Sequence, residues 1–116
     1  MTVETSIFGA LRALASDRVY RDIAPQTVTD LPRITFQQVG GQAVNFLDSA
    51  VPSKKNARFQ VNCWAISRDA AAVLSRQVEG AMRTLNATVL SAPVAVYESD
   101  PPLYGTRQDF SLWHTD

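Results

Sequence analysis

The chain has 116 residues, of which 46% are hydrophobic and 19% are charged, and eleven basic residues balance eleven acidic ones. These values fit one soluble globular domain spanning residues 1–116, and the lack of a basic excess argues against a free-standing nucleic-acid binder. One cysteine and one histidine are too few for a structural zinc site, and a single cysteine cannot form a disulfide within the chain.

The N-terminal stretch MTVETSIFGALRALASDRVY has no basic start and no long apolar run, so we expect no signal peptide. No segment of the sequence approaches the roughly 20 consecutive apolar residues that span a membrane. The sequence therefore predicts a protein that is made and used in the cytoplasm, without export.

The N-terminal part of the chain predicts a helix and then a loop. Apolar residues at helical spacing predict a short amphipathic helix over residues 5–15, with Thr5 or Ser6 as its cap. Residues 16–33 are rich in polar side chains and hold two prolines, so we expect a loop there. Its expected anchors to the core are Val19, Tyr20 and Ile23.

Two strands and a polar connection are predicted next. Alternating apolar residues predict a strand over residues 33–39, which a pair of glycines ends, and a second short strand over residues 43–47. Residues 48–57 are mostly polar and predict a loop or hairpin tip that carries Lys54 and Lys55 at its end.

The stretch ARFQVNCWAISRDAAAVL changes its period halfway. Its first half alternates, which predicts a strand over residues 58–66 with Cys63 on the apolar side and Trp64 on the polar side. Ser67 suits the cap of a helix. Apolar residues then recur at helical spacing as far as Asn86, which predicts a long helix of about five turns.

The C-terminal part of the chain predicts two more strands. One lies within residues 90–98, and the other runs over residues 106–113 after a break at DPPLYG. The sum is an α+β domain, with a mostly antiparallel sheet of four to five strands packed against a long central helix and a short N-terminal helix.

Candidate catalytic and metal-binding residues are few. Cys63 shares the apolar side of its strand and has no histidine near it in sequence, so we interpret it as core filling. His114 lies outside any serine-centred motif, and Glu98 and Asp100 suit a solvated turn better than an acid–base pair. The glycines form no phosphate-binding motif. We therefore expect no enzyme activity, no cofactor and no metal.

The outward faces of two predicted strands are more unusual. Each face has three polar residues and then a tryptophan: Arg58, Gln60, Asn62 and Trp64 on one, and Arg107, Asp109, Ser111 and Trp113 on the other. The face is either solvated, with its tryptophans under loops, or a subunit interface, where tryptophan and arginine are favoured. The basic run around Lys54 is either a solvated tip or a contact for phosphates or an acidic neighbour. The candidate interface residues are Lys54, Lys55, Arg58, Trp64, Arg107 and Trp113.

Four stretches follow one another along the chain: RVYRDIAPQ, LPRITFQQVGG, ARFQVNCWAISRDAAAVLSRQVEGAM and LYGTRQDFSLW. Together, and in this order, they resemble the small tail completion, or tail terminator, proteins of long-tailed bacteriophages and prophages. That family's pattern has a short N-terminal helix, a VYxDxAPQ loop, an LPxIxFQxVxG strand, an RxQVxxWA strand that leads into the long helix, and a final DFSxW strand. The resemblance covers nearly the whole chain.

The resemblance implies a virion structural protein and not an enzyme. It implies a homo-oligomeric ring, expected to be a hexamer, on the head-proximal end of the tail tube. The ring would end tail polymerisation and help to join tail to head, in contact with the tail tube protein and a head-completion or connector protein. DNA would pass through its lumen without sequence-specific binding. The implied location is the virion tail, with the host cytoplasm during assembly and no membrane.

Three other functions stay open on the sequence alone. Another head–tail connector, such as a head-closure or adaptor protein, shares the same context. A small ligand-binding or enzymatic α+β domain would show a concave pocket with convergent polar groups. An RNA-binding sheet would carry aromatic side chains at the centre of its exposed face, whereas both tryptophans here fall at strand ends.

Overall fold

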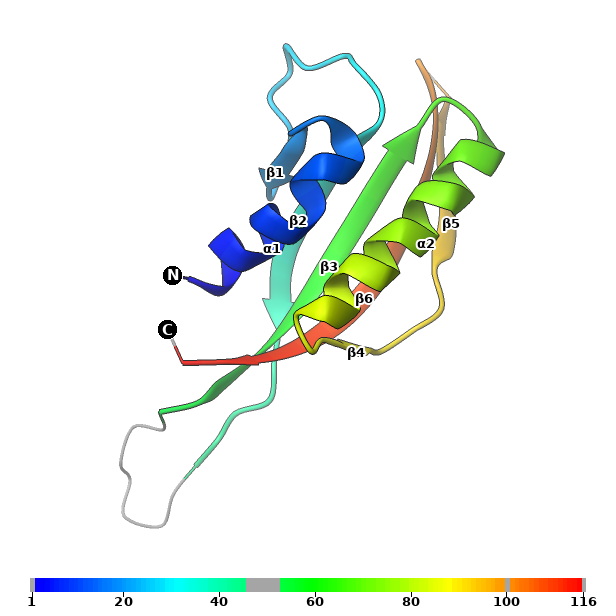
Figure 1. The fold of residues 1–116 in the computed structure, drawn as a ribbon. Coiled ribbons are helices and arrows are strands. Elements are labelled where there is room, and N and C mark those ends of the chain that lie inside the picture. Colours follow the sequence, from blue (N-terminus) through cyan, green and yellow to red (C-terminus); the bar gives the residue numbers. More distant parts are fainter. Residues whose placement is uncertain (1, 46–52, 100, 116) are drawn as a thin grey trace.

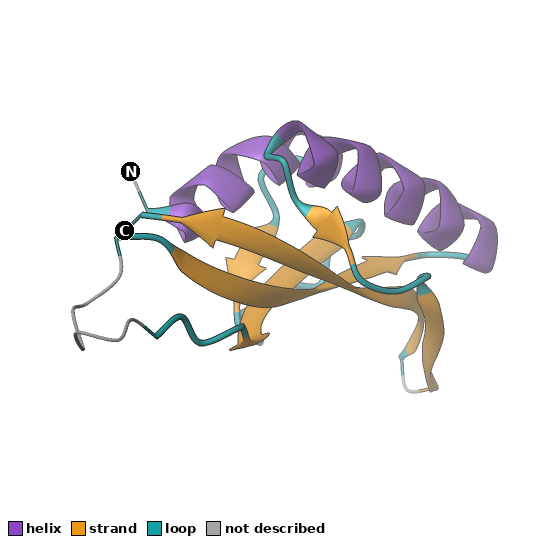
Figure 2. Cartoon of the chain, turned by 90° about the horizontal axis from the view of Figure 1, so that it is seen from below, coloured by secondary structure: helices purple, strands orange, loops and turns teal. Residues whose placement is uncertain are grey.

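A computed structural model describes residues 2–45, 53–99 and 101–115, which form one sheet with helices on one of its faces (Figure 1, Figure 2). The helical elements are α1 (Val3–Leu11), a 3-10 helix η1 (Arg12–Ala15) that directly follows it, and α2 (Arg68–Thr84). The strands are β1 (Val19–Arg21), β2 (Arg33–Gly40), β3 (Lys55–Ala65), β4 (Thr88–Val89), β5 (Val94–Ser99) and β6 (Pro102–His114). The chain is α+β, as its sequence predicts.

The sheet has the strand order β1-β2-β3-β6-β4, and β5 also pairs with β6. Only β1 and β2 pair in parallel among the described strands, and the other four pairings are antiparallel. The pairing of β3 with β6 uses all eleven residues of β3, from Lys55 opposite His114 to Ala65 opposite Tyr104. The sequence predicts four to five strands and the structure has six, because the short strands β1 and β4 were not predicted.

The core lies between the sheet and the helices. Alternate residues of β3 are buried there: Ala57, Phe59, Val61, Cys63 and Ala65. Phe59 lies opposite Phe110 of β6, and its ring centroid is 6.1 Å from that of Phe36 in β2. Buried side chains of α1 and α2 complete the same cluster: Ile7, Leu11, Leu74, Val78 and Met82. The alternation that predicts the strand is therefore the pattern that fills the core.

The helix α2 begins at the predicted cap. The Ser67 hydroxyl accepts a hydrogen bond from the backbone N–H of Ala70 at 3.1 Å. The helix has 17 residues, and Asn86 beyond its end has a left-handed φ of 62°. It shares the sheet face with α1, which lies beside it, so the structure does not show the predicted long central helix, while the second, N-terminal helix is present as predicted (Figure 1). The sheet is five strands across, because β4 and β5 both pair with β6, and its width of about 19 Å exceeds the diameter of one helix, about 10 Å.

The N-terminal region differs from its prediction in two respects. Thr2 caps α1, since its hydroxyl accepts a hydrogen bond from the backbone N–H of Thr5 at 3.1 Å, and neither Thr5 nor Ser6 serves as the cap. The strand β1 lies in a segment predicted as a loop. Val19 is buried as expected, whereas Ile23 is 78% exposed and does not anchor the loop to the core.

Three other boundaries also differ. Residues 43–45 lie outside any strand, and the rest of that predicted strand falls in residues 46–52, outside the described residues. The strand β3 begins at Lys55, within the predicted polar connection. Pro102 begins β6 inside the predicted break, because the first residue of a strand tolerates the missing backbone donor of proline. Asp100 lies outside the described residues.

Candidate interaction surfaces

The sheet face opposite the helices carries no helix (Figure 2). The residues of β3 and β6 that alternate with the core point toward this open face, which confirms the predicted orientation of both strands. These residues are Arg58, Gln60, Asn62 and Trp64 in β3, and Arg107, Asp109, Ser111 and Trp113 in β6. Because the two strands are antiparallel neighbours, their polar side chains form one continuous surface.

An ion pair neutralises one of the candidate interface residues. Both Nε and Nη2 of Arg58 donate to Oδ2 of Asp109, at 2.9 and 2.6 Å. The Arg58 side chain is 49% exposed, so the pair contributes no more than about 1 kcal/mol to stability. Arg107 is exposed and lies opposite Asn62 in the ladder. Of the basic run predicted around Lys54, Arg58 is neutralised by Asp109. Lys54 and Lys55 take no part in the ion pairs of the described residues.

Trp64 is half-buried and packs on the neighbouring strand. A Cβ at Gly105 would lie 2.7 Å from Cε3 of Trp64 and 2.7 Å from the carbonyl oxygen of Cys63. Glycine at this position therefore makes room for the indole ring. The loop after β1 also reaches this end of the open face, where Trp64, Arg33 and Thr35 help to line a small hollow of about 230 Å³. This contact gives Trp64 a structural role in covering the sheet.

Trp113 lies at the other end of the β3–β6 pair. It pairs with Asn56, which is eight residues from Trp64 along β3, so the two tryptophans are about 26 Å apart. Trp113 is 53% exposed, and Lys54 and Lys55 are exposed at the same end of the strand pair, where Lys55 lies opposite His114 and on the other side of the sheet from Trp113. We call Lys54, Lys55 and Trp113 the tip. The structure thus groups three of the six candidate residues and places Trp64 far from them.

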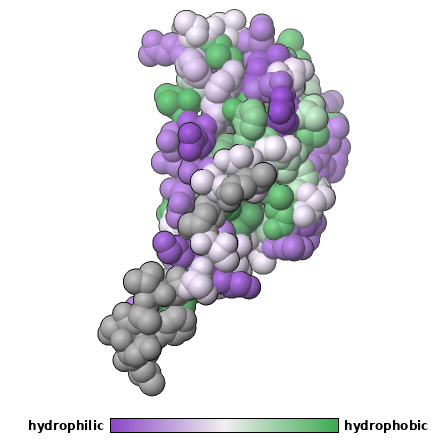
Figure 3. Space-filling view, turned by 60° about the vertical axis from the view of Figure 1, so that its left-hand side comes forward, coloured by the Kyte–Doolittle hydropathy of each residue, from purple (hydrophilic) through white to green (hydrophobic). Residues whose placement is uncertain are grey.

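Hydrogen bonds fix the backbone around the tip. Oδ1 of Asn56 accepts from the backbone N–H of Gln42 at 2.9 Å, and its Nδ2 donates to the Ser111 hydroxyl at 2.8 Å. On the side of the molecule shown in Figure 3, apolar residues form small groups between polar ones. The Asn56 bonds fix the backbone of the strand pair from which the exposed Trp113 side chain projects.

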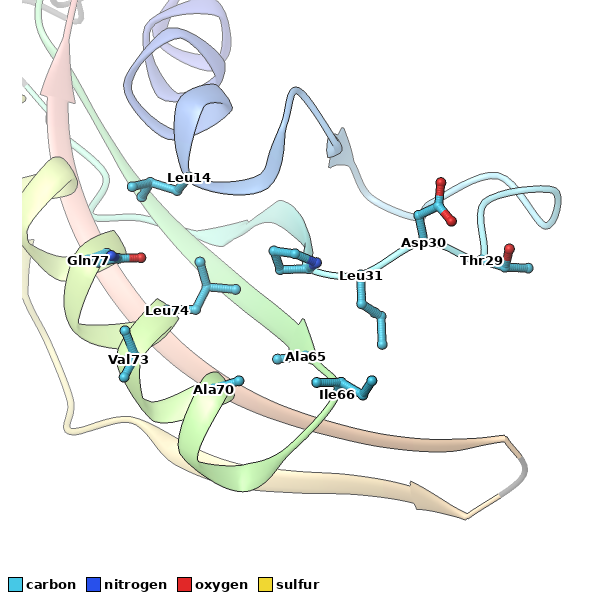
Figure 4. A pocket seen from close by; sticks show the side chains of 11 residues that line it. Leu14, Thr29, Asp30, Leu31, Ala65, Ile66, Ala70, Val73, Leu74 and Gln77 are labelled. Carbon is cyan, nitrogen blue, oxygen red and sulfur yellow. The ribbon is translucent and has the colours of Figure 1, made fainter.

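A groove that the sequence analysis did not identify lies at the opposite end of β3 (Figure 4). It has a volume of about 560 Å³, and η1, the loop before β2, the end of β3 and the first half of α2 line it. Its apolar lining residues are Leu14, Leu31, Pro32, Ala65, Ile66, Ala70, Val73 and Leu74. Ile66 is 78% exposed and Val73 is 46% exposed. We call this set of residues, with Thr29, Asp30 and Gln77 at its rim, the groove.

The walls of the groove are held in place by local contacts. Arg18 donates from Nε to the carbonyl oxygen of Pro32 at 2.9 Å and from Nη2 to that of Leu31 at 3.1 Å. The Ser67 cap starts α2 directly after Ile66, which fixes the other wall. Ile66 directly follows the last inward-facing residue of β3, and Val73 lies in α2 outside its apolar stripe. Apolar residues at these two outward positions were the sequence signal for an exposed apolar site.

The structure supports the interpretation of Cys63 as core filling. Its side chain is 2% exposed, and burial raises the pKa of the thiol to about 12, against a hydrogen bond with Thr106 that lowers it. His114 pairs with Lys55, at the opposite end of the strand pair from Cys63. Among residues 2–45, 53–99 and 101–115, no three His, Cys, Asp or Glu side chains gather as metal ligands do.

Native Cys63 is expected to resist thiol reagents. With a pKa of about 12, roughly one thiol in ten thousand is ionised at pH 8, and the thiolate is the reactive form. The folded protein should show less than one-hundredth of the thiol labelling rate of the urea-unfolded chain, measured by absorbance. Cys63→Ala should stay folded and lose about 1 kcal/mol of stability. Equal labelling rates in the two states would contradict the burial of this residue.

In comparisons with known proteins, no family model matches the chain, and no curated protein matches it. Within the described residues, neither helix has the length and apolar character needed to cross a membrane.

Proposed function

We propose that this chain is a structural protein of a phage or prophage tail, which caps the head-proximal end of the tail tube as a ring. The ring ends tail polymerisation and helps to join the tail to the head. The observation that carries this proposal is the order of the four family-like stretches in the sequence. They fall in turn on β1 and its loop, on β2, on β3 with α2, and on β6.

The character of the surfaces supports a contact function over a catalytic one. The tip presents an exposed tryptophan and two lysines, and the groove presents exposed aliphatic side chains. Interface hot spots are enriched in tryptophan, and the buried centre of an interface is more apolar than its rim. A ligand-binding α+β domain would instead direct polar groups into its pocket. Thr29 and Asp30 point away from the apolar part of the groove and only the Gln77 amide among its lining residues points toward it, so polar groups do not converge there (Figure 4).

Removal of the gene from the phage or prophage that encodes it tests the proposal. A tail terminator predicts tail tubes of uncontrolled length without heads, and supply of the protein in trans should restore normal particles. Tails of normal length that fail to join heads would favour the alternative of a head-closure or adaptor protein. Unchanged, infectious particles would contradict both functions.

Charge reversal at the tip should impair assembly without unfolding the domain. Lys54 and Lys55 are exposed, and neither takes part in the ion pairs of the described residues. The double variant Lys54→Glu/Lys55→Glu should therefore keep its circular dichroism spectrum and thermal midpoint, and yield at least tenfold fewer joined particles in complementation. Arg76→Glu reverses one charge at an exposed site of α2 that takes no part in those ion pairs, and it should complement normally. A normal particle yield from the lysine variant would remove the tip from the proposal.

A further inference from the structure

The tip and the groove lie at opposite ends of the same strand. Lys55 begins β3, and Ala65 ends it within the groove lining, which places the two surfaces about 33 Å apart (Figure 1). They are also different in kind, since one projects an aromatic ring and the other is a concave apolar site. Two different patches on one chain are what a head-to-tail contact between identical subunits requires.

We propose that Trp113 of one copy docks into the groove of the next copy, with Lys54 beside Asp30. This inference rests on the proposed assembly of the protein as a ring, and it names the two surfaces that meet in that assembly.

Shape and apolar character favour this contact. The groove volume of about 560 Å³ lies within the range of sites that enclose whole small molecules, so an indole ring fits inside it. Docking would bury the exposed part of Trp113 against Ile66 and Val73, which are themselves exposed in the single chain. Tryptophan in an apolar pocket is a frequent energetic centre of protein interfaces.

The charges of the two surfaces are complementary. Asp30 is the single ionisable residue among those that line the groove, and the tip contributes two lysines. None of the ion pairs among the described residues uses Asp30, Lys54 or Lys55. The contact therefore brings opposite charges together without breaking an existing pair. Because such exposed charges are screened by salt, association should weaken as ionic strength rises.

A second copy also fits the groove better than a small polar ligand does. The two polar residues of its outer rim, Thr29 and Asp30, point away from the apolar part, so they are placed to meet groups that lie around the groove (Figure 4). Lys54, at the same end of the strand pair as the inserted tryptophan, would occupy that position. The backbone at Trp113 is fixed in β6 by its pairing with Asn56. This lowers the conformational entropy that the protein would lose on docking.

The test uses two variants that each damage one surface, Trp113→Ala and Ile66→Glu. Both positions are more than half exposed, so both variants should fold. Sedimentation velocity of the wild type should show closed oligomers, and each variant alone should be monomeric at the same concentration. An equimolar mixture should give dimers and nothing larger, because it contains one intact tip and one intact groove per pair.

Two matched substitutions serve as controls. Tyr97→Ala removes an aromatic ring of nearly equal exposure, 54% against 53% for Trp113, and Ile23→Glu adds a carboxylate outside the groove at an isoleucine that is 78% exposed, as Ile66 is. Both control variants should keep the wild-type mass distribution.

A disulfide trap detects the contact even where it is weak. The double variant Asp30→Cys/Lys54→Cys keeps Trp113 and the apolar lining of the groove, and it should form covalent oligomers on mild oxidation at least tenfold faster than the double variant Asp30→Cys/Tyr97→Cys. Cys63 does not interfere, because it is buried.

Three results would overturn the inference. Wild-type rings that persist in both Trp113→Ala and Ile66→Glu would show that other surfaces join the subunits, and would leave the proposed ring intact. A mixture that remains monomeric would show that tip and groove do not meet. A monomeric wild type without accelerated crosslinking would exclude the contact, while the gene-removal experiment would still decide the tail function separately.

Discussion

Phe59→Ala is expected to lower the free energy of unfolding by about 3–5 kcal/mol. Phe59 is fully buried in the middle of β3, opposite Phe110 and 6.1 Å from the ring of Phe36. The substitution removes the ring from the centre of the core, and the surrounding strands and helices can fill the resulting cavity only in part. Since small domains are stable by about 5–15 kcal/mol, this single change should leave the protein marginally folded.

Urea unfolding followed by circular dichroism measures this loss. All samples should have the same protein concentration, because self-association stabilises the folded state by mass action. Ile23→Ala is the control, since Ile23 is 78% exposed and its truncation should change stability by less than about 0.5 kcal/mol. A loss below about 1 kcal/mol for Phe59→Ala would contradict the packing of the core described above.

Gly105→Ala is expected to destabilise the domain by about 1–3 kcal/mol, although it adds a single methyl group. The new Cβ would lie 2.7 Å from the carbonyl oxygen of Cys63 and 2.7 Å from the ring of Trp64. The carbonyl belongs to the backbone of the central strand and cannot rotate away. Either β6 moves away from β3 or the indole leaves its position, and both weaken the pairing of the two longest strands.

Unfolding followed by tryptophan fluorescence suits this variant, because Trp64 is one of only two tryptophans in the chain. Its folded-state emission should shift to longer wavelength as the indole becomes more exposed. Gly80→Ala is the matched control. Gly80 lies inside α2 with no atom within 4 Å of its added Cβ, so alanine should stabilise the helix by about 0.5–1 kcal/mol. Equal effects at both glycines would contradict the close contact at Gly105.

Local sequence patterns were sufficient for the joint between β3 and α2. The alternation around Cys63, the cap at Ser67 and the helical stripe after it are contiguous, and each depends on neighbours in the chain. The outward faces of β3 and β6 were also predicted correctly. Their antiparallel pairing was not readable from either strand alone, and it is this pairing that separates Trp64 from Trp113.

Elements that depend on distant partners could not be predicted in this way. The strand β1 has three residues, and its hydrogen bonds go to β2, across a loop. The two residues of β4 pair only with β6 among the described strands. The groove draws its lining from separate segments around Leu14, Leu31, Ile66 and Val73, so no continuous stretch of sequence marks it.

The position of β6 has a consequence for the synthesis of the protein. It is the last strand in chain order, yet it lies between β3 and β4 within the sheet. When a nascent chain has emerged from the ribosome as far as the end of α2, β3 can pair with β2 but not yet with β6. One edge of β3 is therefore still unpaired. Chains usually fold from the N-terminus as they are made, but this sheet must wait for its final strand.

The same order also delays the capacity to associate. Trp113 reaches its position only when β6 pairs with β3 at Asn56. A subunit that is incomplete or truncated before β6 therefore lacks the tip. If subunits join through the proposed contact of tip and groove, the strand order alone would exclude incomplete chains from that contact.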